Sequence, residues 1–297
     1  MNGWINCYKP RNVSSSWMTL WIKKLLGVDK VGHVGTLDPL AQGVLPLALG
    51  QATKLIECTQ DYDKTYEFTV MFGATTETGD AEGQIVGRTE LIPTLSELAG
   101  VLGGFVGRIQ QTPSKYSAIK VDGTRAYERV RTGQSFVMPT RSVEVYLLEV
   151  KECILPIATL VARVSKGTYI RTLAEDIAVA LGSLAYTVDL KRTQVGPFRL
   201  EEAVYPWKAF SQKVAQDLLP TDFVMRYPRV HVDEVIAERV RHGQRIWMAG
   251  EPGVDWARGA SEQDDISDGR VGIYCRGLLV GMGCIKEGVL HPSKNIV

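Results

Sequence analysis

Residues 64–72, KTYEFTVMF, place an apolar side chain at every second position from Tyr66 to Phe72, and this pattern limits the possible folds more than any other stretch. Tyr66, Phe68, Val70 and Phe72 fall on one face of an extended backbone, which predicts a strand with one buried face. A strand of this kind belongs in a sheet that a further layer of structure covers. The chain is therefore expected to build a sheet with other elements packed on it.

Other segments supply neighbours for that strand. Alternation resumes in residues 142–150 and 158–165, and residues 44–58, VLPLALGQATKLIEC, predict a buried strand followed by a turn or short helix. Residues 172–182, TLAEDIAVALG, have helical spacing and end at a glycine. Because helices and strands interleave without a strict strand–helix–strand order, we expect a mixed α/β or α+β fold.

An amphipathic helix is predicted near the N-terminus, in residues 14–28. The serines at 14–16 are good N-caps, and Gly27 ends the pattern. Trp17, Trp21 and Leu25 are spaced four apart and share one face of this helix, which the spacing predicts to be its packing face.

The composition changes near residue 228. Residues 229–297 hold a short basic helix and then short strands separated by glycines, which predicts a small β-rich module after a larger domain of residues 1–228. Between the helix and the strands, the polar residues 247–270 are expected to form a flexible loop.

Bulk properties narrow the function classes. The 297 residues are 45% hydrophobic, and 34 basic residues nearly balance 33 acidic ones, so any nucleic-acid contact has to come from local patches. Five widely spaced cysteines without a C-x-x-C pair argue against a disulfide scaffold or a zinc finger and fit a reducing cytosol. No apolar run approaches a membrane span and no signal core is present, so a soluble cytoplasmic protein is expected.

A lone carboxylate stands out in residues 32–43, GHVGTLDPLAQG. Asp38 lies between Leu37 and Pro39 in a segment that is otherwise glycine, small polar and apolar. An Asp-Pro turn explains it without any chemistry, because Asp commonly bonds its own backbone there. His33 in the same stretch can be a metal ligand, a base, a wedge or an ordinary loop histidine. With four histidines in the chain and no helical pair beside acids, we expect no metal site.

Residues 103–141 are predicted to be loop-rich, and residues 108–131 within them carry six basic against two acidic side chains. Tyr116 and Tyr127 are interleaved with the basic residues. Basic and aromatic side chains in one loop fit looped or single-stranded RNA, which they hold by phosphate contacts and stacking. An ordinary solvated loop is the alternative.

A second polar segment, SKGTYIRTLAED, places Lys166, Gly167 and Thr168 between a strand and a helix, where they can form an anion site. Tyr169 and Arg171 are two residues apart, so an extended backbone projects both from one face. The alternative is a tyrosine in the core and an arginine on the surface.

Together these stretches resemble the bacterial tRNA pseudouridine-55 synthase family of the TruB type. GWINCYKPRNVSS is similar to its first motif, KVGHVGTLDPLAQGVLPLALGQATK to the second and DYDKTYEF to the third. QTPSKYSAIKVDGTRAYERVRTG resembles its RNA-gripping loop, and SKGTYIRTLAEDI and DLKRTQVGPF its later motifs. The resemblance implies a mixed, mainly antiparallel sheet flanked by helices, with a C-terminal PUA-like RNA-binding domain at residues 229–297.

The resemblance also implies a reaction. One uridine in the tRNA T-loop, at position 55, loses its glycosidic bond, the base rotates, and C5 rejoins the ribose. Asp38 is then the essential carboxylate, either as nucleophile or as base at C2′. Tyr66 stacks on the base and mediates proton transfer, and Arg171 pairs with Asp38. No metal or redox cofactor is implied.

Further roles follow by the same resemblance. Tyr169 lines the pocket, Leu190 covers the base, Lys9 and Pro10 support the first motif, and His33 inserts into the stack of the loop. An apolar pocket around one carboxylate keeps water out, and chemistry on a base requires that the base leave its stack. The residues expected to grip RNA in the basic loop are Lys115, Tyr116, Lys120, Arg125, Tyr127 and Arg129.

Three departures from the family pattern concern RNA affinity rather than chemistry: Val13 replaces a threonine, Ser114 a proline and Lys191 an arginine. Two alternatives remain open. A guide-RNA-dependent relative would share the catalytic motifs, although the long basic loop favours a stand-alone enzyme, expected to be monomeric. A non-catalytic RNA-folding factor would keep the basic loop and the C-terminal module.

Overall fold

The computed structural model describes residues 1–297 except 118, 207–213, 215, 250, 256–268 and 297, and of Tyr127 it describes the backbone only. A nine-stranded sheet forms the body of the molecule, in the order β1-β3-β12-β4-β11-β10-β7, with β13 paired to β12 and β2 to β3. All pairs are antiparallel except the short β3–β12 pair. The strands are β1 (Gly3–Lys9), β2 (Val31–His33), β3 (Gln42–Leu49), β4 (Lys64–Phe72), β7 (Gly107–Gln111), β10 (Arg141–Ile154), β11 (Ile157–Val164), β12 (Ala185–Val195) and β13 (Phe198–Arg199).

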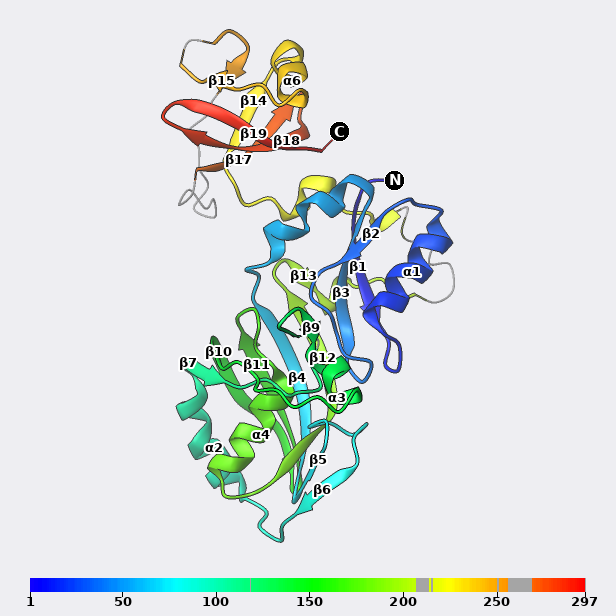
Figure 1. The fold of residues 1–297 in the computed structure, drawn as a ribbon, viewed down its shortest axis with the longest axis vertical. Helices are drawn as coiled ribbons and strands as arrows, with labels where there is room; N and C mark the ends of the chain where they lie inside the picture. Colours follow the sequence, from blue (N-terminus) through cyan, green and yellow to red (C-terminus); the bar gives the residue numbers. More distant parts are fainter. Residues whose placement is uncertain (118, 207–213, 215, 250, 256–268, 297) are drawn as a thin grey trace.

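Strand β4 confirms the alternation that the sequence predicts. Tyr66, Phe68, Val70 and Phe72 are all buried, and the residues between them are only partly covered. Phe68 joins a hydrophobic core with apolar residues of helices α2 (Leu95–Leu102) and α4 (Ile170–Ala180). The two helices lie together beside the β4–β11–β10 part of the sheet in Figure 1. The mixed, mainly antiparallel fold class is thereby confirmed.

Helix α1 (Ser15–Leu26) has the predicted ends, because the Ser14 side chain accepts the Trp17 N–H and Gly27 adopts the left-handed conformation. Its predicted packing face is wrong. Met18 and Ile22 are the buried apolar residues of this helix, whereas Trp17 is 51% exposed. Of the predicted stripe, Trp17 and Leu25 are exposed, whereas Trp21 is partly buried and packs against the core at the edge.

Helix α4 begins earlier than the motif suggested. Arg171 lies in its first turn and Tyr169 is its N-cap residue, so the prediction of one extended segment through both is wrong. Gly182 adopts a positive φ just after the helix, as its predicted end requires.

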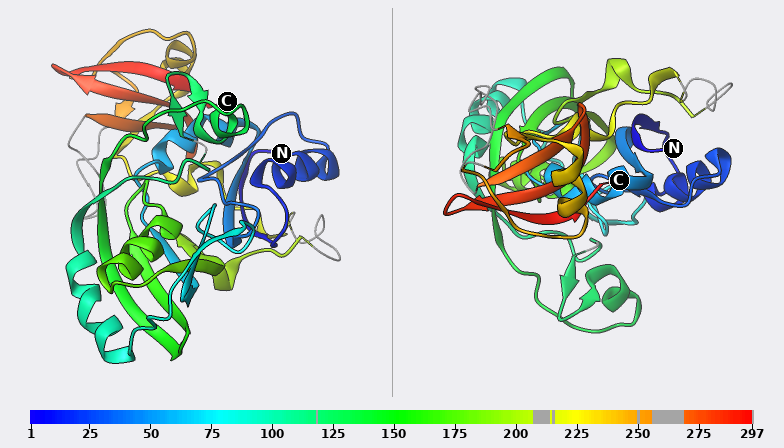
Figure 2. Two further views of the ribbon diagram at one scale, coloured as in Figure 1. Left: turned by 60° about the horizontal axis from the view of Figure 1, so that its bottom comes forward. Right: turned by 90° about the horizontal axis from the view of Figure 1, so that it is seen from above.

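Residues 103–141 are more ordered than predicted. After the 3₁₀ turn η2 (Gly103–Phe105) and strand β7, the chain forms a hairpin of β8 (Lys120–Val121) and β9 (Thr124–Arg125) and then helix α3 (Ala126–Arg131). In the right-hand view of Figure 2 this green segment extends away from the body of the molecule. A second small hairpin, β5 (Ala74–Thr76) with β6 (Ile85–Arg88), follows β4.

The C-terminal residues form a separate six-stranded sheet in the order β15-β19-β18-β17-β14-β16. It has its own hydrophobic core, which includes residues of helix α6, and it lies at one end of the long axis in Figure 1. Most of the predicted flexible loop, at residues 250 and 256–268, lies outside the described residues. The elements are β14 (Arg229–Val232), α6 (Glu234–Arg241), β15 (Ile246–Trp247), β16 (Val254–Asp255), β17 (Arg270–Cys275), β18 (Leu278–Lys286) and β19 (Val289–Asn295).

Three 3₁₀ segments complete the chain: η1 (Gly50–Thr59), η3 (Leu200–Glu202) and η4 (Thr221–Val224). The segment η1 is the short helix predicted after the buried strand β3, and η4 leads into the C-terminal sheet. In the part of the chain that the structure describes, no helix is long and apolar enough to cross a bilayer.

Candidate active site

A cavity of about 340 Å³ lies where the turn before β3, the start of β4, the start of α4 and the middle of β12 meet. These segments are far apart in the sequence, and the sheet order brings them together because β12 pairs with both β3 and β4. The cavity is lined by Gly35, Thr36, Leu37, Asp38, Lys64, Tyr66, Ser117, Ile119, Gly167, Thr168, Tyr169, Ile170, Arg171, Leu190 and Arg192.

The turn that carries Asp38 is fastened on two sides. The Ser15 hydroxyl donates to the Leu37 carbonyl at 2.9 Å and accepts the Leu37 N–H at 2.9 Å. The fully buried Lys9 ammonium donates to the Pro39 carbonyl of this turn at 3.4 Å and to the carbonyls of Val13 at 2.7 Å and Pro10 at 2.9 Å. Burial lowers the pKa of Lys9 to about 8, although the nearby Asp38 charge acts in the opposite direction. The first motif therefore holds the turn in place through Lys9. Lys9 and Pro10 themselves do not line the cavity.

Arg171 joins the carboxylate of Asp38 to a second one. Its Nη2 lies 2.7 Å from Oδ2 of Asp38, and its Nη1 lies 3.0 Å from Oδ2 of Asp80 and donates to the Thr78 carbonyl at 2.8 Å. The Arg171 and Asp80 side chains are 7% and 4% exposed, whereas that of Asp38 is 43% exposed and opens on the cavity. The guanidinium is held by buried groups on one side and orients the Asp38 carboxylate on the other.

Tyr66 and Leu190 form an apolar wall, and both are more than nine-tenths buried. Tyr169 also lines the cavity, and its backbone exchanges two hydrogen bonds with the Gln111 side chain, at 2.9 and 3.1 Å. Burial raises the pKa of the Tyr169 phenol. The expected pocket residues Asp38, Tyr66, Arg171, Tyr169 and Leu190 thus meet in one cavity.

His33 lies outside the cavity wall. Its Nδ1 is 3.0 Å from the Thr19 hydroxyl and its Nε2 is 3.1 Å from the Thr36 hydroxyl. Burial, followed by the charge of Arg192, lowers its pKa, which favours the neutral ring. The ring is thus held between α1 and the turn that carries Asp38.

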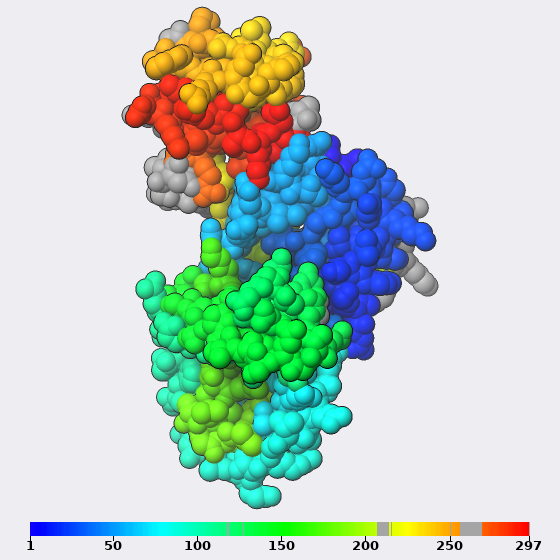
Figure 3. Space-filling model, viewed as in Figure 1, coloured from blue at the N-terminus to red at the C-terminus, as the bar shows by residue number. Residues whose placement is uncertain are grey.

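The basic segment lies over the cavity, because its Ser117 and Ile119 are part of the lining. Figure 3 shows the green atoms of this segment covering the middle of the molecule. Lys115, Lys120 and Arg125 are exposed. Among the other residues predicted to grip RNA, the Tyr116 hydroxyl donates to Glu77, Arg129 lies 3.3 Å from Asp122, and the side chain of Tyr127 is outside the described residues.

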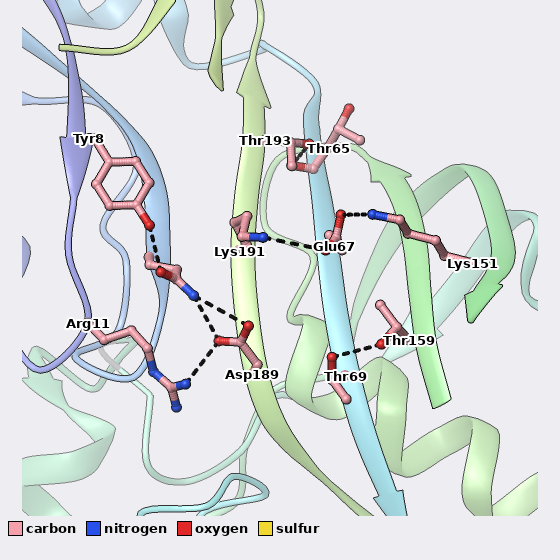
Figure 4. A network of polar contacts seen from close by, with 11 residues as sticks. Tyr8, Arg11, Thr65, Glu67, Thr69, Lys151, Thr159, Asp189, Lys191 and Thr193 are labelled. Carbon is pink, nitrogen blue, oxygen red and sulfur yellow. Dashed lines mark hydrogen bonds and ion pairs between the residues drawn. The ribbon is translucent and has the colours of Figure 1, made fainter. Parts of the chain in front are cut away.

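The predicted anion site is only partly present. Gly167 and Thr168 line the cavity, but Lys166 turns outward and forms an ion pair with Asp61. Lys191, one of the departures from the family pattern, also points away from the cavity. It reaches toward Glu67, at 3.5 Å, on the opposite face of β12 from Leu190 (Figure 4).

Three lining or supporting residues were missed from the sequence: Lys64, Asp80 and Arg192. Asp80 sits in a polar turn that reads as solvated, and only a search for the partners of a buried arginine could have found it. Lys64 and Arg192 belong to strands, where their spacing from Tyr66 and Leu190, two residues in each case, signals the same face. Among the described residues, no three His, Cys, Asp or Glu side chains gather where they could hold a metal ion.

Comparison with known proteins shows which protein family this chain resembles. Residues 23–170 match the model of the TruB family pseudouridylate synthase N-terminal domain, and residues 228–295 match that of the pseudouridine synthase II TruB C-terminal region. The chain is 40% identical over 295 residues to tRNA pseudouridine synthase B of Burkholderia pseudomallei strain 668, covering 97% of this chain and 95% of that protein. It is 45% identical over 208 residues to the protein of the same name from Rickettsia conorii, covering 68% and 59%.

Solved structures agree in fold. A chain of an H/ACA RNP bound to a substrate RNA containing 2′-deoxyuridine superposes with a TM-score of 0.71 at 24% identity, covering 99% of this chain and 85% of that one. A chain of an archaeal box H/ACA sRNP complex gives 0.70 at 24% identity, with 99% and 86% covered. At this identity the likeness concerns the fold alone.

Proposed function

This chain belongs to the TruB family of pseudouridylate synthases, and on that premise we propose that it converts uridine 55 in the T-loop of tRNA to pseudouridine. The observation that best supports this proposal is the Asp38–Arg171 ion pair, at 2.7 Å, in a cavity that is lined by a buried tyrosine and a buried leucine. The enzyme is an isomerase: it exchanges the bond between N1 and C1′ for a bond between C5 and C1′, and the C5 proton is replaced by one on N1.

In this proposal Asp38 acts on the ribose. Its carboxylate either attacks C1′ or removes the proton from C2′, and both routes require that it be ionised and aimed at the sugar. Arg171 fixes the direction of this carboxylate, because a charge-assisted hydrogen bond from its Nη2 reaches Oδ2 of Asp38 at 2.7 Å. The reaction is redox-neutral, and we propose that it proceeds without metal or cofactor.

The target base enters the cavity only if it leaves its stack in the T-loop. Tyr66 then lies against the base, Leu190 covers it and Tyr169 closes the side of the pocket, which keeps water from the cleaved sugar. His33, held between Thr19 and Thr36, is positioned to fill the space that the base leaves in the loop. Tyr66 also carries the proton between the base and its surroundings.

RNA contacts outside the cavity fall to two regions. The exposed basic residues of segment 108–131 stand beside the pocket, where phosphate groups of the T-loop have to pass. Residues 1–228 form the catalytic domain in this proposal, and residues 229–297 a PUA-like domain that adds affinity. We propose a monomer that works without guide RNA, in the cytoplasm where its tRNA substrate is found.

The direct test is incubation of the purified protein with unmodified tRNA transcript, followed by mapping of pseudouridine. We expect one modified position, uridine 55, without added RNA or protein. We expect Asp38→Asn to abolish conversion and to change tRNA affinity only a fewfold, because phosphate and stacking contacts supply most of the binding. A guide-dependent enzyme would leave the transcript unmodified until RNA was added, and an RNA-folding factor would bind it without any conversion by the unaltered protein.

A further inference from the structure

Arg192 is a buried cation whose hydrogen bonds all go to neutral groups. Its side chain lies in β12 and is 1% exposed. Its Nε donates to the Val44 carbonyl at 2.8 Å, and its Nη2 donates to the carbonyls of Gly35 at 2.8 Å and Val34 at 3.3 Å. Within the residues that the structure describes, no carboxylate forms an ion pair with it. Buried charges in proteins are normally paired, because an unpaired one is costly.

The charge of Arg192 acts on the surrounding groups. After burial itself, Arg192 is the main cause that lowers the pKa of Lys64, which falls to about 8, and of His33. It also contributes to the lowered pKa of Lys9, where Asp38 acts in the opposite direction. Three basic groups on different elements therefore lie within range of the Arg192 charge.

The same guanidinium faces the cavity. Its Nη1 lies 3.1 Å from the position that a Cβ would take on Gly35, which has a φ of +65°, so a glycine is needed at this approach. Tyr66 lies on the neighbouring strand directly opposite Arg192. Lys64 adds a second ammonium to this end of the cavity, although Asp61 and Asp63 partly offset its charge.

The two ends of the cavity thus differ in charge. At one end the Arg171 guanidinium is balanced by the carboxylates of Asp38 and Asp80. At the other end the guanidinium of Arg192 interacts with the Tyr66 hydroxyl, but among the residues that the structure describes no carboxylate balances its charge. A ligand that fills the cavity and carries negative charge near Tyr66 would balance the charge of Arg192.

We propose that Arg192, assisted by Lys64, stabilises the negative charge on the uracil ring after its bond to the ribose has broken. This rests on the proposed function. When the bond between N1 and C1′ breaks, its electron pair leaves with the base, which becomes an anion with the charge spread over N1 and the two ring oxygens. C1′ is satisfied either by the Asp38 carboxylate or by loss of the C2′ proton to Asp38. The charge on the detached base is the same on both routes, and it disappears when C5 bonds to C1′ and a proton from solvent reaches N1 as the C5 proton departs.

This role differs from mere support of the Gly35 turn, and the difference can be measured through the leaving group. Fluorine at C5 withdraws electrons and stabilises the uracil anion by itself. An enzyme that has lost its anion-stabilising cation should therefore lose less rate on a 5-fluorouridine substrate than on uridine. A variant that has only a displaced turn should lose the same factor on both.

The experiment uses full-length protein and tRNA with uridine or 5-fluorouridine at the target position. Single-turnover loss of the N-glycosidic bond is followed at saturating enzyme for Arg192→Gln, Arg192→Lys and Lys64→Met. Lys151→Met is the control, since Lys151 is a surface cation paired with Glu67 away from the cavity. Thermal unfolding and tRNA affinity are recorded for every variant.

For Arg192→Gln we expect the single-turnover rate on uridine to fall about 100-fold, the scale of one electrostatic donor to a developing anion. On 5-fluorouridine the factor by which the rate falls should be at least tenfold smaller, on the same reasoning. Arg192→Lys should recover part of the loss, Lys64→Met should show a smaller loss with the same substrate preference, and Lys151→Met should match the unaltered enzyme. Equal losses on both substrates would overturn the proposal. If Arg192→Gln does not fold, equal losses in Arg192→Lys and Lys64→Met overturn it in the same way. Failure of the unaltered protein to modify uridine would instead overturn the proposed function.

Discussion

Arg171 is central to the candidate site, because its guanidinium links the Asp38 carboxylate, which is 43% exposed, to the buried carboxylate of Asp80. One guanidinium satisfies two carboxylates and a backbone carbonyl. Asp80 in turn accepts from the Thr78 hydroxyl and from the Glu82 N–H at 3.1 Å. The position of the Asp38 carboxylate therefore depends on a polar turn more than forty residues away in the sequence.

Asp80→Asn should slow the chemical step without weakening RNA binding. The amide is nearly isosteric but removes the charge that balances Arg171, so the guanidinium is free to turn toward Asp38 or toward solvent. We expect a decrease of about 10- to 100-fold in the single-turnover rate, on the scale of a supporting charged hydrogen bond, and an affinity for tRNA within a fewfold. Asp122→Asn, on the surface of the basic segment, is the control. A normal rate in Asp80→Asn would mean that Arg171 is held by Asp38 and the Thr78 carbonyl alone.

Glu175, one turn after Arg171 in α4, gives a pH-dependent prediction for stability. Burial, opposed by the Arg171 charge, raises the pKa of its carboxyl to about 7 from an ordinary value of 4.5. The folded state thus holds the proton more tightly than the unfolded state. The stabilisation is present below about pH 4.5 and is lost as the pH rises through about 7.

Glu175→Gln should remove that loss. The free energy of unfolding of the variant, relative to the unaltered protein, should increase between pH 5 and pH 8 by about 1 kcal/mol, a value reduced from the full pKa shift because the side chain is only half-buried. Denaturant unfolding at both pH values measures it. A difference that stays constant with pH would show that the carboxyl titrates alike in both states.

At the residue scale the sequence predicted which residues line the candidate site better than it predicted the residues that support them. Asp38, Tyr66 and Arg171 belong to motifs with a chemical reading, and the structure brings them together. Asp80 and Arg192 could not be found in this way, because each matters only through what is folded against it. A carboxylate in a polar turn and an arginine in a strand look ordinary until the sheet order places them beside the cavity.

At the element scale, the hydrophobic periodicity predicted β4 as a strand and α1 as a helix, but it did not always predict which face is buried. The alternation in β4 identifies its buried face because the three aromatic residues of the strand and Val70 occupy that face alone. In α1 two apolar stripes compete. The tryptophan stripe is larger, yet Trp17 is exposed and stacks on the partly buried Trp21 with ring centroids 6.1 Å apart, while Met18 and Ile22 enter the core.

Two substitutions in α1 separate these stripes. Ile22→Ala should lower the free energy of unfolding by about 2–5 kcal/mol, because the side chain is fully buried and its loss leaves a cavity. Trp17→Gln should lower it by about 1 kcal/mol or less, since it loses only an exposed stacking contact. Leu20→Gln, also exposed, is the control for helix propensity. Denaturant unfolding measures both values. A larger loss of unfolding free energy for Trp17→Gln than for Ile22→Ala would show that the tryptophan face is the packing face, as the spacing predicted.

At the scale of the whole molecule, the C-terminal sheet packs against the large domain through a shared hydrophobic cluster. Tyr274, Leu279, Met282 and Ile296 share a hydrophobic cluster with residues of the large domain, among them Trp4. Polar contacts surround this cluster: Lys294 lies 2.6 Å from Glu57, and Lys54 donates to the Asn295 carbonyl at 2.6 Å. The sequence showed the change in composition at residue 228, but a composition change does not reveal how much apolar surface two parts share.

This shared core changes what a truncation can test. Deletion of residues 229–297 exposes the side chains that pack against the C-terminal sheet, so the remaining chain should unfold at a lower temperature than the full protein. We expect weaker tRNA binding and, at saturating RNA, a single-turnover rate within a fewfold of normal. Thermal unfolding has to accompany the kinetics, because loss of activity in an unfolded truncation says nothing about the role of the sheet.

A charge reversal tests the RNA contribution of the C-terminal sheet without disturbing the shared core. Three arginines of this region already have acidic partners: Arg229 with Asp222, Arg239 with Glu251 and Arg241 with Glu238. Arg245 instead lines an open pocket of about 460 Å³ together with Lys286, and both side chains are exposed. Although Glu287 also lines this pocket, its two cations leave it able to offer positive charge to a phosphate backbone.

The double variant Arg245→Glu with Lys286→Glu should bind tRNA about tenfold or more weakly, with a binding constant that depends less steeply on salt because fewer phosphate contacts release counterions. The single-turnover rate at saturating RNA and the temperature of unfolding should stay unchanged, since neither residue touches the cavity or the shared core. Arg276→Glu is the matched control, because Arg276 is an exposed arginine of the same sheet that faces Glu234 at 2.9 Å. Titrations at several salt concentrations give both quantities. Equal affinity and equal salt dependence in the double variant and in the unaltered protein would leave the basic segment at 108–131 as the main source of RNA affinity, and the C-terminal sheet would then serve to complete the hydrophobic core.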